Sequence, residues 1–212
     1  MMLVMIQRIL LGALLALSPA MVSAQSGIEL TPYIGYRFGS SFDIRNNTTN
    51  QVQRLELRDA RSVGLAINLD LPEAGKQTEL YFSRQETRAV AADTLLSPIS
   101  SQVDLVIYQA QFGGLYFPGG MTTGGFASGV IGVTRLEPKP SGLRTHHRAS
   151  LTLGGGYKQP INRNLLLRFD LRGIYTALDS GGSVFCSGGC TARFESSGYF
   201  QAEASAGLAF RF

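Results

Sequence analysis

The most constraining feature of this sequence is a strict alternation of apolar and polar residues, which recurs in eight segments of about ten residues each. In the first segment, Leu30, Ile34 and Phe38 share one face, and Glu29 and Arg37 share the other. A period of two is that of a β-strand, whose successive side chains point to opposite faces. We find no helical period past residue 25, so the sequence predicts an all-β fold. The eight predicted strands are 28–38, 62–69, 78–88, 103–117, 123–136, 148–157, 164–175 and 198–212.

The connections between these segments alternate in length. Three are short and carry Pro or Gly turn chemistry, namely 70–76, 118–122 and 158–163. Four are longer and polar, namely 39–54, 89–102, 137–147 and 179–197. Short turns at one end and long loops at the other are typical of an eight-stranded antiparallel up-and-down transmembrane β-barrel.

Alternation alone does not say which face points outward, so a soluble barrel with an apolar interior is the competing interpretation. The polar faces carry charges of both signs, which can neutralise one another inside a narrow barrel but would line an apolar pocket poorly. We predict an interior polar network of Glu29, Arg37, Glu79, Arg168, Asp170, Arg172 and Glu203.

Aromatic residues near both strand ends also favour the membrane barrel, because such girdles lie at the two lipid–water boundaries. Toward the long loops we place Tyr36, Phe38, Phe82, Tyr175 and Phe200. Toward the short turns we place Tyr116, Phe117, Phe126, Tyr157, Phe210 and Phe212.

Residues 1–24 are predicted to be a cleaved secretory signal, with Arg8 near the start, a short apolar stretch and a Val-Ser-Ala site ending at Ala24. The apolar stretch is shorter than the roughly 17 to 25 residues of a membrane-spanning helix. The mature barrel domain would then be 25–212. The whole chain has a formal net charge of +4, too mild to suggest nucleic acid as a partner.

The two cysteines, Cys186 and Cys190, lie in the last long connection. An exported chain meets an oxidising compartment, so we predict a local disulfide. A metal site would need further ligands nearby, whereas His146 and His147 lie some forty positions earlier in the chain. We therefore expect neither a metal nor a cofactor.

The last segment, 198–212, alternates regularly and ends in Phe. With this strand the chain resembles the small eight-stranded outer-membrane barrels of Gram-negative bacteria, the OmpA/OmpX/OmpW-like group. The resemblance implies an outer-membrane location, contact with lipid and lipopolysaccharide, and help from periplasmic chaperones during export. It also implies that Leu208, Phe210 and Phe212 form the signal read by the barrel-assembly machinery.

Three functions follow as hypotheses. The first is a non-enzymatic barrel with an envelope-structural or surface-interaction role through its long loops, since eight strands enclose too little space for a general porin. Its surface ligand is unknown, but Lys139, Arg144 and Arg148 in the third long loop could contact lipopolysaccharide phosphates, or form a merely solvated loop.

The second hypothesis is a narrow channel or carrier for small apolar solutes, with inward apolar residues as its lining. The third is a lipid A-modifying enzyme. His146 and Ser150 would share a strand face but lie about 13 Å apart, at roughly 3.3 Å per residue. His147 and Ser150 would point to opposite faces, and the His–Ser pair two residues apart that lipid A deacylases carry is missing, so we predict that the chain is not an enzyme.

Overall fold

The structure is a computed structural model that describes residues 27–46, 52–91, 102–140, 145–178, 192–194 and 197–212. The predicted signal at 1–24, the cysteine pair Cys186 and Cys190, and Arg144 lie outside these residues. Among the residues described, no helix is both long and apolar enough to cross a membrane.

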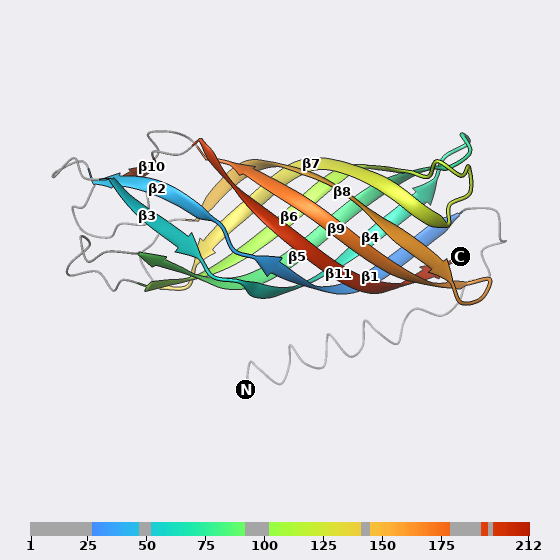
Figure 1. The fold of residues 1–212 in the computed structure, drawn as a ribbon, viewed down its shortest axis with the longest axis horizontal. Helices are drawn as coiled ribbons and strands as arrows, with labels where there is room; N and C mark the ends of the chain where they lie inside the picture. Colours follow the sequence, from blue (N-terminus) through green and yellow to red (C-terminus); the bar gives the residue numbers. More distant parts are fainter. Residues whose placement is uncertain (1–26, 47–51, 92–101, 141–144, 179–191, 195–196) are drawn as a thin grey trace, which may run out of the picture.

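Eight long antiparallel strands form a closed barrel, in which every strand is tilted against the long axis (Figure 1). Around the barrel they are β1 (Ile28–Phe38), β4 (Ala60–Asp70), β5 (Lys76–Ala91), β6 (Gln102–Tyr116), β7 (Gly124–Pro138), β8 (His146–Pro160), β9 (Leu165–Ala177) and β11 (Gly198–Arg211). The sheet closes because β1, the first of these strands, pairs with β4 on one side and with β11, the last of them, on the other. The predicted fold class is therefore confirmed.

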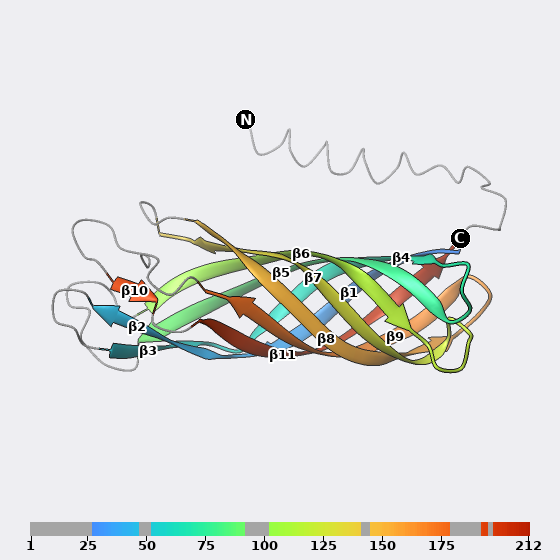
Figure 2. The same ribbon diagram turned by 90° about the horizontal axis from the view of Figure 1, so that it is seen from above.

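Three shorter strands lie within the long connections at one end of the barrel (Figure 2). These are β2 (Ser41–Asn46), β3 (Val52–Leu57) and β10 (Ala192–Phe194). β2 and β3 form a hairpin, and β3 continues the wall by pairing with the end of β5. The sequence analysis had placed only a polar loop here, because the alternation of buried Leu55 and Leu57 with exposed Arg54 and Glu56 is too short to stand out.

The opposite end of the barrel carries the three short turns, 71–75, 117–123 and 161–164, together with the end of β11 (Figures 1 and 2). Gly75 and Gly120 have φ angles of 71° and 74°, which L residues with a side chain rarely adopt. These glycines let the first two turns reverse the chain within a few residues.

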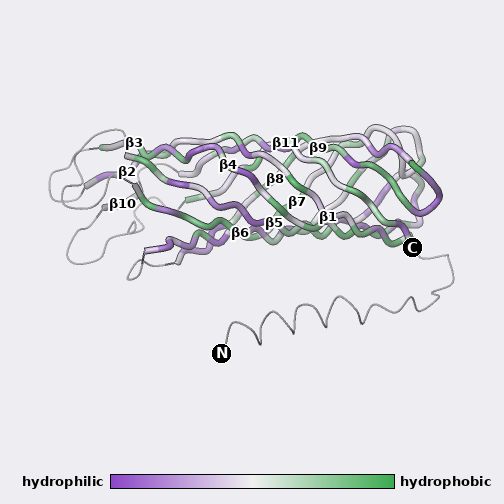
Figure 3. The backbone as a smooth tube through the Cα atoms, turned by 90° about the horizontal axis from the view of Figure 1, so that it is seen from below, coloured by the Kyte–Doolittle hydropathy of each residue, from purple (hydrophilic) through white to green (hydrophobic). Residues whose placement is uncertain are grey.

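The outer wall of the barrel is apolar. Ile34, Ile131 and Leu171 are 71%, 64% and 69% exposed, although a soluble protein would bury such residues. Figure 3 shows hydrophobic and hydrophilic stretches alternating along the strands. Polar side chains such as Glu79, Gln111 and Arg168 face inward. An apolar wall around a polar interior is the arrangement of a transmembrane barrel, as the sequence analysis predicted.

Two of the predicted girdle residues are not on this wall. Phe117 and Phe126 are buried in the lumen near the short turns, with ring centroids 5.3 Å apart. Their placement in the outer girdle was wrong, because Phe126 has the inward parity of β7 and Phe117 follows the end of β6. The cationic groups of Lys158 and Arg168 lie over these rings, which stabilises them inside a polar lumen.

Candidate functional site

The middle of the lumen holds a cluster in which two guanidinium groups meet two carboxylates. Glu79 accepts hydrogen bonds from Arg168 at 2.7 Å and from Arg172 at 2.9 Å. Asp170 accepts from the same two arginines at 2.9 Å and 3.0 Å. Asn68 donates to Glu79 at 3.0 Å. Two positive and two negative charges leave no net charge, and their hydrogen bonds offset part of the cost of burying them.

A second cluster pairs Arg37 with Glu203. The Arg37 Nε donates to the Glu203 carboxylate at 2.5 Å, and Tyr81 and Ser62 donate to the same carboxylate at 2.7 Å and 2.8 Å. The guanidinium of Arg172 lies 4.2 Å from the centroid of the Tyr81 ring, so the two clusters touch through this ring. The charged network therefore extends across the lumen, from β1, β11 and β9 on one side to β5, which supplies Glu79 and Tyr81, on the other.

A third cluster lies toward the short turns and is centred on Glu29. Lys158 and Arg211 both form ion pairs with Glu29. Gln77 donates to Glu29 at 3.1 Å and accepts from Lys158 at 2.7 Å. The structure thus brings the seven predicted network residues together in three clusters of buried side chains. It adds Lys158, which the sequence analysis missed although it has the inward parity of β8.

Uncharged polar side chains from β6, β7 and β8 also fill the lumen. Gln111 donates to the Ser150 hydroxyl at 2.9 Å and accepts from Thr152 at 2.9 Å. Gln109 accepts from Ser83 at 2.9 Å and donates to Thr134 at 3.3 Å. The predicted network included none of these residues, because a neutral amide or hydroxyl on an alternating strand shows its inward parity but not its partner.

The outer part of the lumen, toward the long connections, holds a cluster of buried apolar side chains. The rings of Phe42 and Tyr199 lie 5.9 Å apart there. The full cluster consists of Phe42, Leu55, Leu57, Ala89, Leu105, Ile107, Leu136, Leu178 and Tyr199. β2 and β3 supply three of these residues, so the hairpin contributes to an apolar cap at this end of the barrel.

On the outer wall, the apolar belt ends at one continuous row of polar and aromatic residues. Directly paired positions across β5, β6, β7 and β8 place Arg84 beside Tyr108, Tyr108 beside Arg135 and Arg135 beside His147. We call these four residues the outer row. The Arg84 guanidinium lies 5.9 Å from the centroid of the Tyr108 ring. Arg84 and Arg135 also form ion pairs with Glu86 and Glu137 respectively.

A groove of about 530 Å³ runs along the outer row and the apolar residues next to it. The apolar part of this outer groove consists of Val63, Leu65, Phe82, Ala110 and Val133. The groove forms because Ala110 is small and lies between the paired Phe82 and Val133. Its lining includes two arginines and a histidine but no carboxylate.

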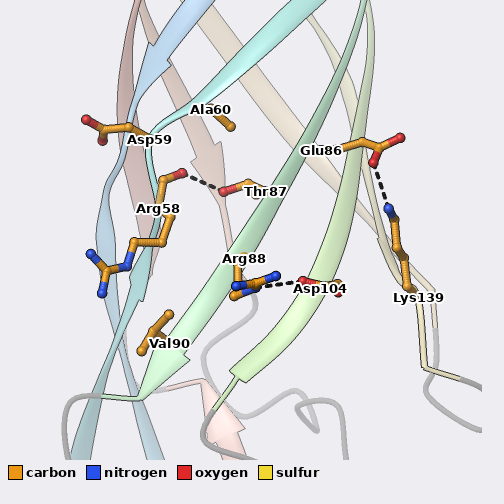
Figure 4. Close-up of a pocket in the computed structure, with 9 residues that line it drawn as sticks. All are labelled: Arg58, Asp59, Ala60, Glu86, Thr87, Arg88, Val90, Asp104 and Lys139. Atoms are coloured by element: carbon orange, nitrogen blue, oxygen red, sulfur yellow. Dashed lines mark hydrogen bonds and ion pairs between the residues drawn. The ribbon is translucent and has the colours of Figure 1, made fainter.

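A polar notch lies next to the outer groove, where the chain passes from β3 to β4 (Figure 4). Lys139 donates to Glu86 at 2.6 Å, and Arg88 donates to Asp104 at 2.8 Å. With Arg58 and Asp59, the notch is lined by three cations and three anions. It therefore offers no net charge to a ligand.

The residues considered for catalysis and lipopolysaccharide binding are placed as follows. Ser150 is buried in the lumen, whereas His147 is exposed on the opposite face of β8. Lys139 is ion-paired to Glu86. Arg148 has the inward parity of β8. Among the described residues, no group of three or more His, Cys, Asp or Glu side chains is placed to hold a metal ion.

The end of β11 pairs with β1 and so completes the closure of the barrel. Phe210 pairs with Leu30 on β1, and the backbone N–H of Phe212 donates to the Ile28 carbonyl at 3.0 Å. The side chains of Leu208, Phe210 and Phe212 are exposed on the outer wall. β11 therefore presents an apolar outer face next to the β1–β11 pairing that closes the barrel.

No protein-family model matches this chain. No curated protein matches it either. Solved structures do: Neisserial surface protein A (NspA) is similar with a TM-score of 0.52 and 13% identity, over 88% of this chain and 98% of that one. The outer membrane protein OprG from Pseudomonas aeruginosa is similar with a TM-score of 0.56 and 14% identity, over 89% of this chain and 97% of that one. At these identities the similarity concerns the fold.

Proposed function

Because this chain has the fold of the small eight-stranded outer-membrane barrels, we propose that it is a non-enzymatic protein of the outer membrane. In this proposal the signal at 1–24 exports the chain, and the barrel-assembly machinery reads Leu208, Phe210 and Phe212. The protein stabilises the envelope or binds surface partners through its outer wall and its long connections, which face outward as they do in barrels of this kind.

The observation that carries the proposal is the filled lumen. The charged side chains of the lumen are joined in clusters such as Glu79 with Arg168 and Arg172. An apolar cap covers them on one side and Phe117 and Phe126 on the other. Opening a path for solute would separate buried ion pairs, at a cost of several kcal/mol for each. The surfaces left for function are therefore the exterior ones.

The proposal is tested first by conductance. The purified barrel in a planar lipid bilayer should leave the membrane current at the baseline of the lipid alone. Steady single-channel steps from the folded protein would contradict a filled lumen. A gel in which the band shifts on boiling confirms in the same sample that the protein is folded.

The cellular role is tested with a deletion strain. We expect the strain to become more sensitive to detergent and to large antibiotics, and the wild-type gene to restore resistance. A variant with 139–145 replaced by a two-residue Asn-Gly turn should restore it only in part, whereas a Gly/Ser replacement of the turn 161–164 should restore it fully. Altered acylation of lipid A in an overexpressing strain, seen by mass spectrometry, would contradict the non-enzymatic assignment.

A carrier for small apolar solutes is a second candidate, supported by the apolar cluster in the outer part of the lumen. Ile107 and Leu136 belong to this cluster and are fully or almost fully buried. Uptake of a small hydrocarbon into vesicles that contain the barrel would favour this function. The Leu136→Phe variant should then block uptake, whereas it leaves an envelope-stabilising role intact.

A further inference from the structure

We propose that the outer groove binds one phosphorylated acyl-chain lipid of the outer leaflet, namely lipid A, with its phosphate on the outer row and an acyl chain on the apolar floor. This inference rests on the outer-membrane location in the proposed function. It goes further by assigning a ligand and a site to the outer wall. The sequence analysis had instead placed the contacts with lipopolysaccharide in the third long connection, at Lys139, Arg144 and Arg148.

The geometry of the groove matches a lipid at the edge of the membrane. The apolar floor, which includes Phe82 and Val133, continues the lipid-facing belt, and the outer row follows immediately toward the long connections. Groups at that depth meet the head groups, where acyl chains end and phosphates begin. Because the long connections face outward in such barrels, this edge belongs to the outer leaflet.

The charge of the outer row selects an anionic head group. Arg84 and Arg135 lie on either side of Tyr108, and His147 extends the row by one strand. Each arginine pairs with a glutamate through part of its guanidinium. A guanidinium carries five N–H donors, so other donors remain to bind a phosphate. Arginine binds phosphate through paired, charge-assisted hydrogen bonds. The notch beside the groove differs because three carboxylates belong to its lining and would repel a phosphate.

The shape of the groove selects an acyl chain. Ala110 lies between two larger side chains, Phe82 and Val133, so a trough of about 530 Å³ remains open between them. That volume is within the range of small-molecule sites. An acyl chain in the trough is held by the same dispersion and burial that hold apolar side chains in a core.

The direct test is native mass spectrometry of the full-length mature barrel in detergent, titrated with bis-phosphorylated lipid A. We expect one equivalent to bind in preference to later ones. The Arg84→Gln and Arg135→Gln variants should each lose roughly tenfold in affinity for this first equivalent, which corresponds to about 1.4 kcal/mol. Arg163→Gln, in a turn at the far end of the barrel, is the matched control and should bind as the wild type does.

Two further variants make the test independent of folding defects. Glu137→Gln removes the carboxylate that competes for Arg135, so it should raise the affinity by a few fold, which no misfolded protein would do. Ala110→Phe fills the trough and should weaken binding without changing any charge. Ala204→Phe, on the outer wall of β11 away from the groove, is its control and should have no effect.

Comparison ligands show whether the groove binds lipid A, another anionic lipid or free phosphate. Dephosphorylated lipid A should lose the first binding step, phosphatidylglycerol should bind more weakly, and inorganic phosphate should not bind measurably. Equal binding to wild type, Arg84→Gln and Arg135→Gln would overturn the assigned site. That result would leave the outer-membrane location untouched, because fractionation of the cell envelope tests the location separately.

Discussion

Replacing Glu79 by Gln isolates the contribution of the lumen network to stability. The substitution keeps the volume of the side chain, so it opens no cavity, but it leaves Arg168 and Arg172 with a single carboxylate partner, Asp170. Breaking a buried ion pair by removing one partner costs about 3–5 kcal/mol. We expect a loss of that size for Glu79→Gln, which is a large fraction of a typical stability of about 5–15 kcal/mol.

The assay is equilibrium unfolding in urea with the barrel in lipid vesicles. The chain has no Trp, so the folded fraction is best followed by far-UV circular dichroism and by the unboiled band on a gel. Glu73→Gln is the matched control. Glu73 pairs with Lys76 in an exposed turn, where the two side chains are 70% and 46% exposed. This control should leave the urea midpoint almost unchanged, because ion pairs between exposed side chains contribute little to stability.

A double variant checks the assignment of the loss to charge. Glu79→Gln combined with Arg172→Gln restores an equal number of positive and negative charges in the cluster. We expect the double variant to be less destabilised than the sum of the single variants, by about 0.5–3 kcal/mol. If Glu79→Gln unfolds at nearly the urea concentration of Glu73→Gln, the lumen is hydrated and the ion pairs do not hold the barrel together.

Two other predictions follow from local geometry. Gly64→Ala should destabilise the barrel by about 1–3 kcal/mol, because the added methyl would overlap the Tyr33 ring and the β5 backbone. Gly125→Ala, with open space at its Cβ position, should change the urea midpoint very little, and equal losses for both variants would refute the packing argument. The side-chain hydrogen bond from Lys76 lowers the pKa of the Glu73 carboxyl below its ordinary 4.5. The ion pair therefore contributes stability above about pH 4.5, and this contribution is lost as the pH falls through the lowered pKa. Lys76→Gln should return the Glu73 pKa toward 4.5 in a ¹³C NMR titration, and an unchanged pKa would contradict the pairing.

Alternation predicted the barrel well because it reports on both faces of a strand at once. Residues such as Glu29 and Arg37 could be placed inside the barrel without any knowledge of their partners, since neighbours two apart share a face. The same reasoning failed for Phe117 and Phe126, where apolar character suggested the outer wall. Strand parity and the end of β6 place them inside, and cations in the lumen accommodate them.

Pairings between distant strands were beyond the sequence. That Arg168 meets Glu79, 89 positions away, depends on the shape of the closed barrel. The outer row likewise exists only because β5, β6, β7 and β8 pair in one register. A shift of that register would move Arg84 and Arg135 apart while leaving every strand's own pattern unchanged.

The sequence by itself therefore determined the eight long strands, their order and the face that most of their side chains take, because those properties depend on a period of two within single strands. The tertiary structure decided which charges neutralise one another, how the β2–β3 hairpin caps the lumen, and where a cationic row meets an apolar groove. Those features depend on the register between strands and on closure of the barrel, which no single strand encodes.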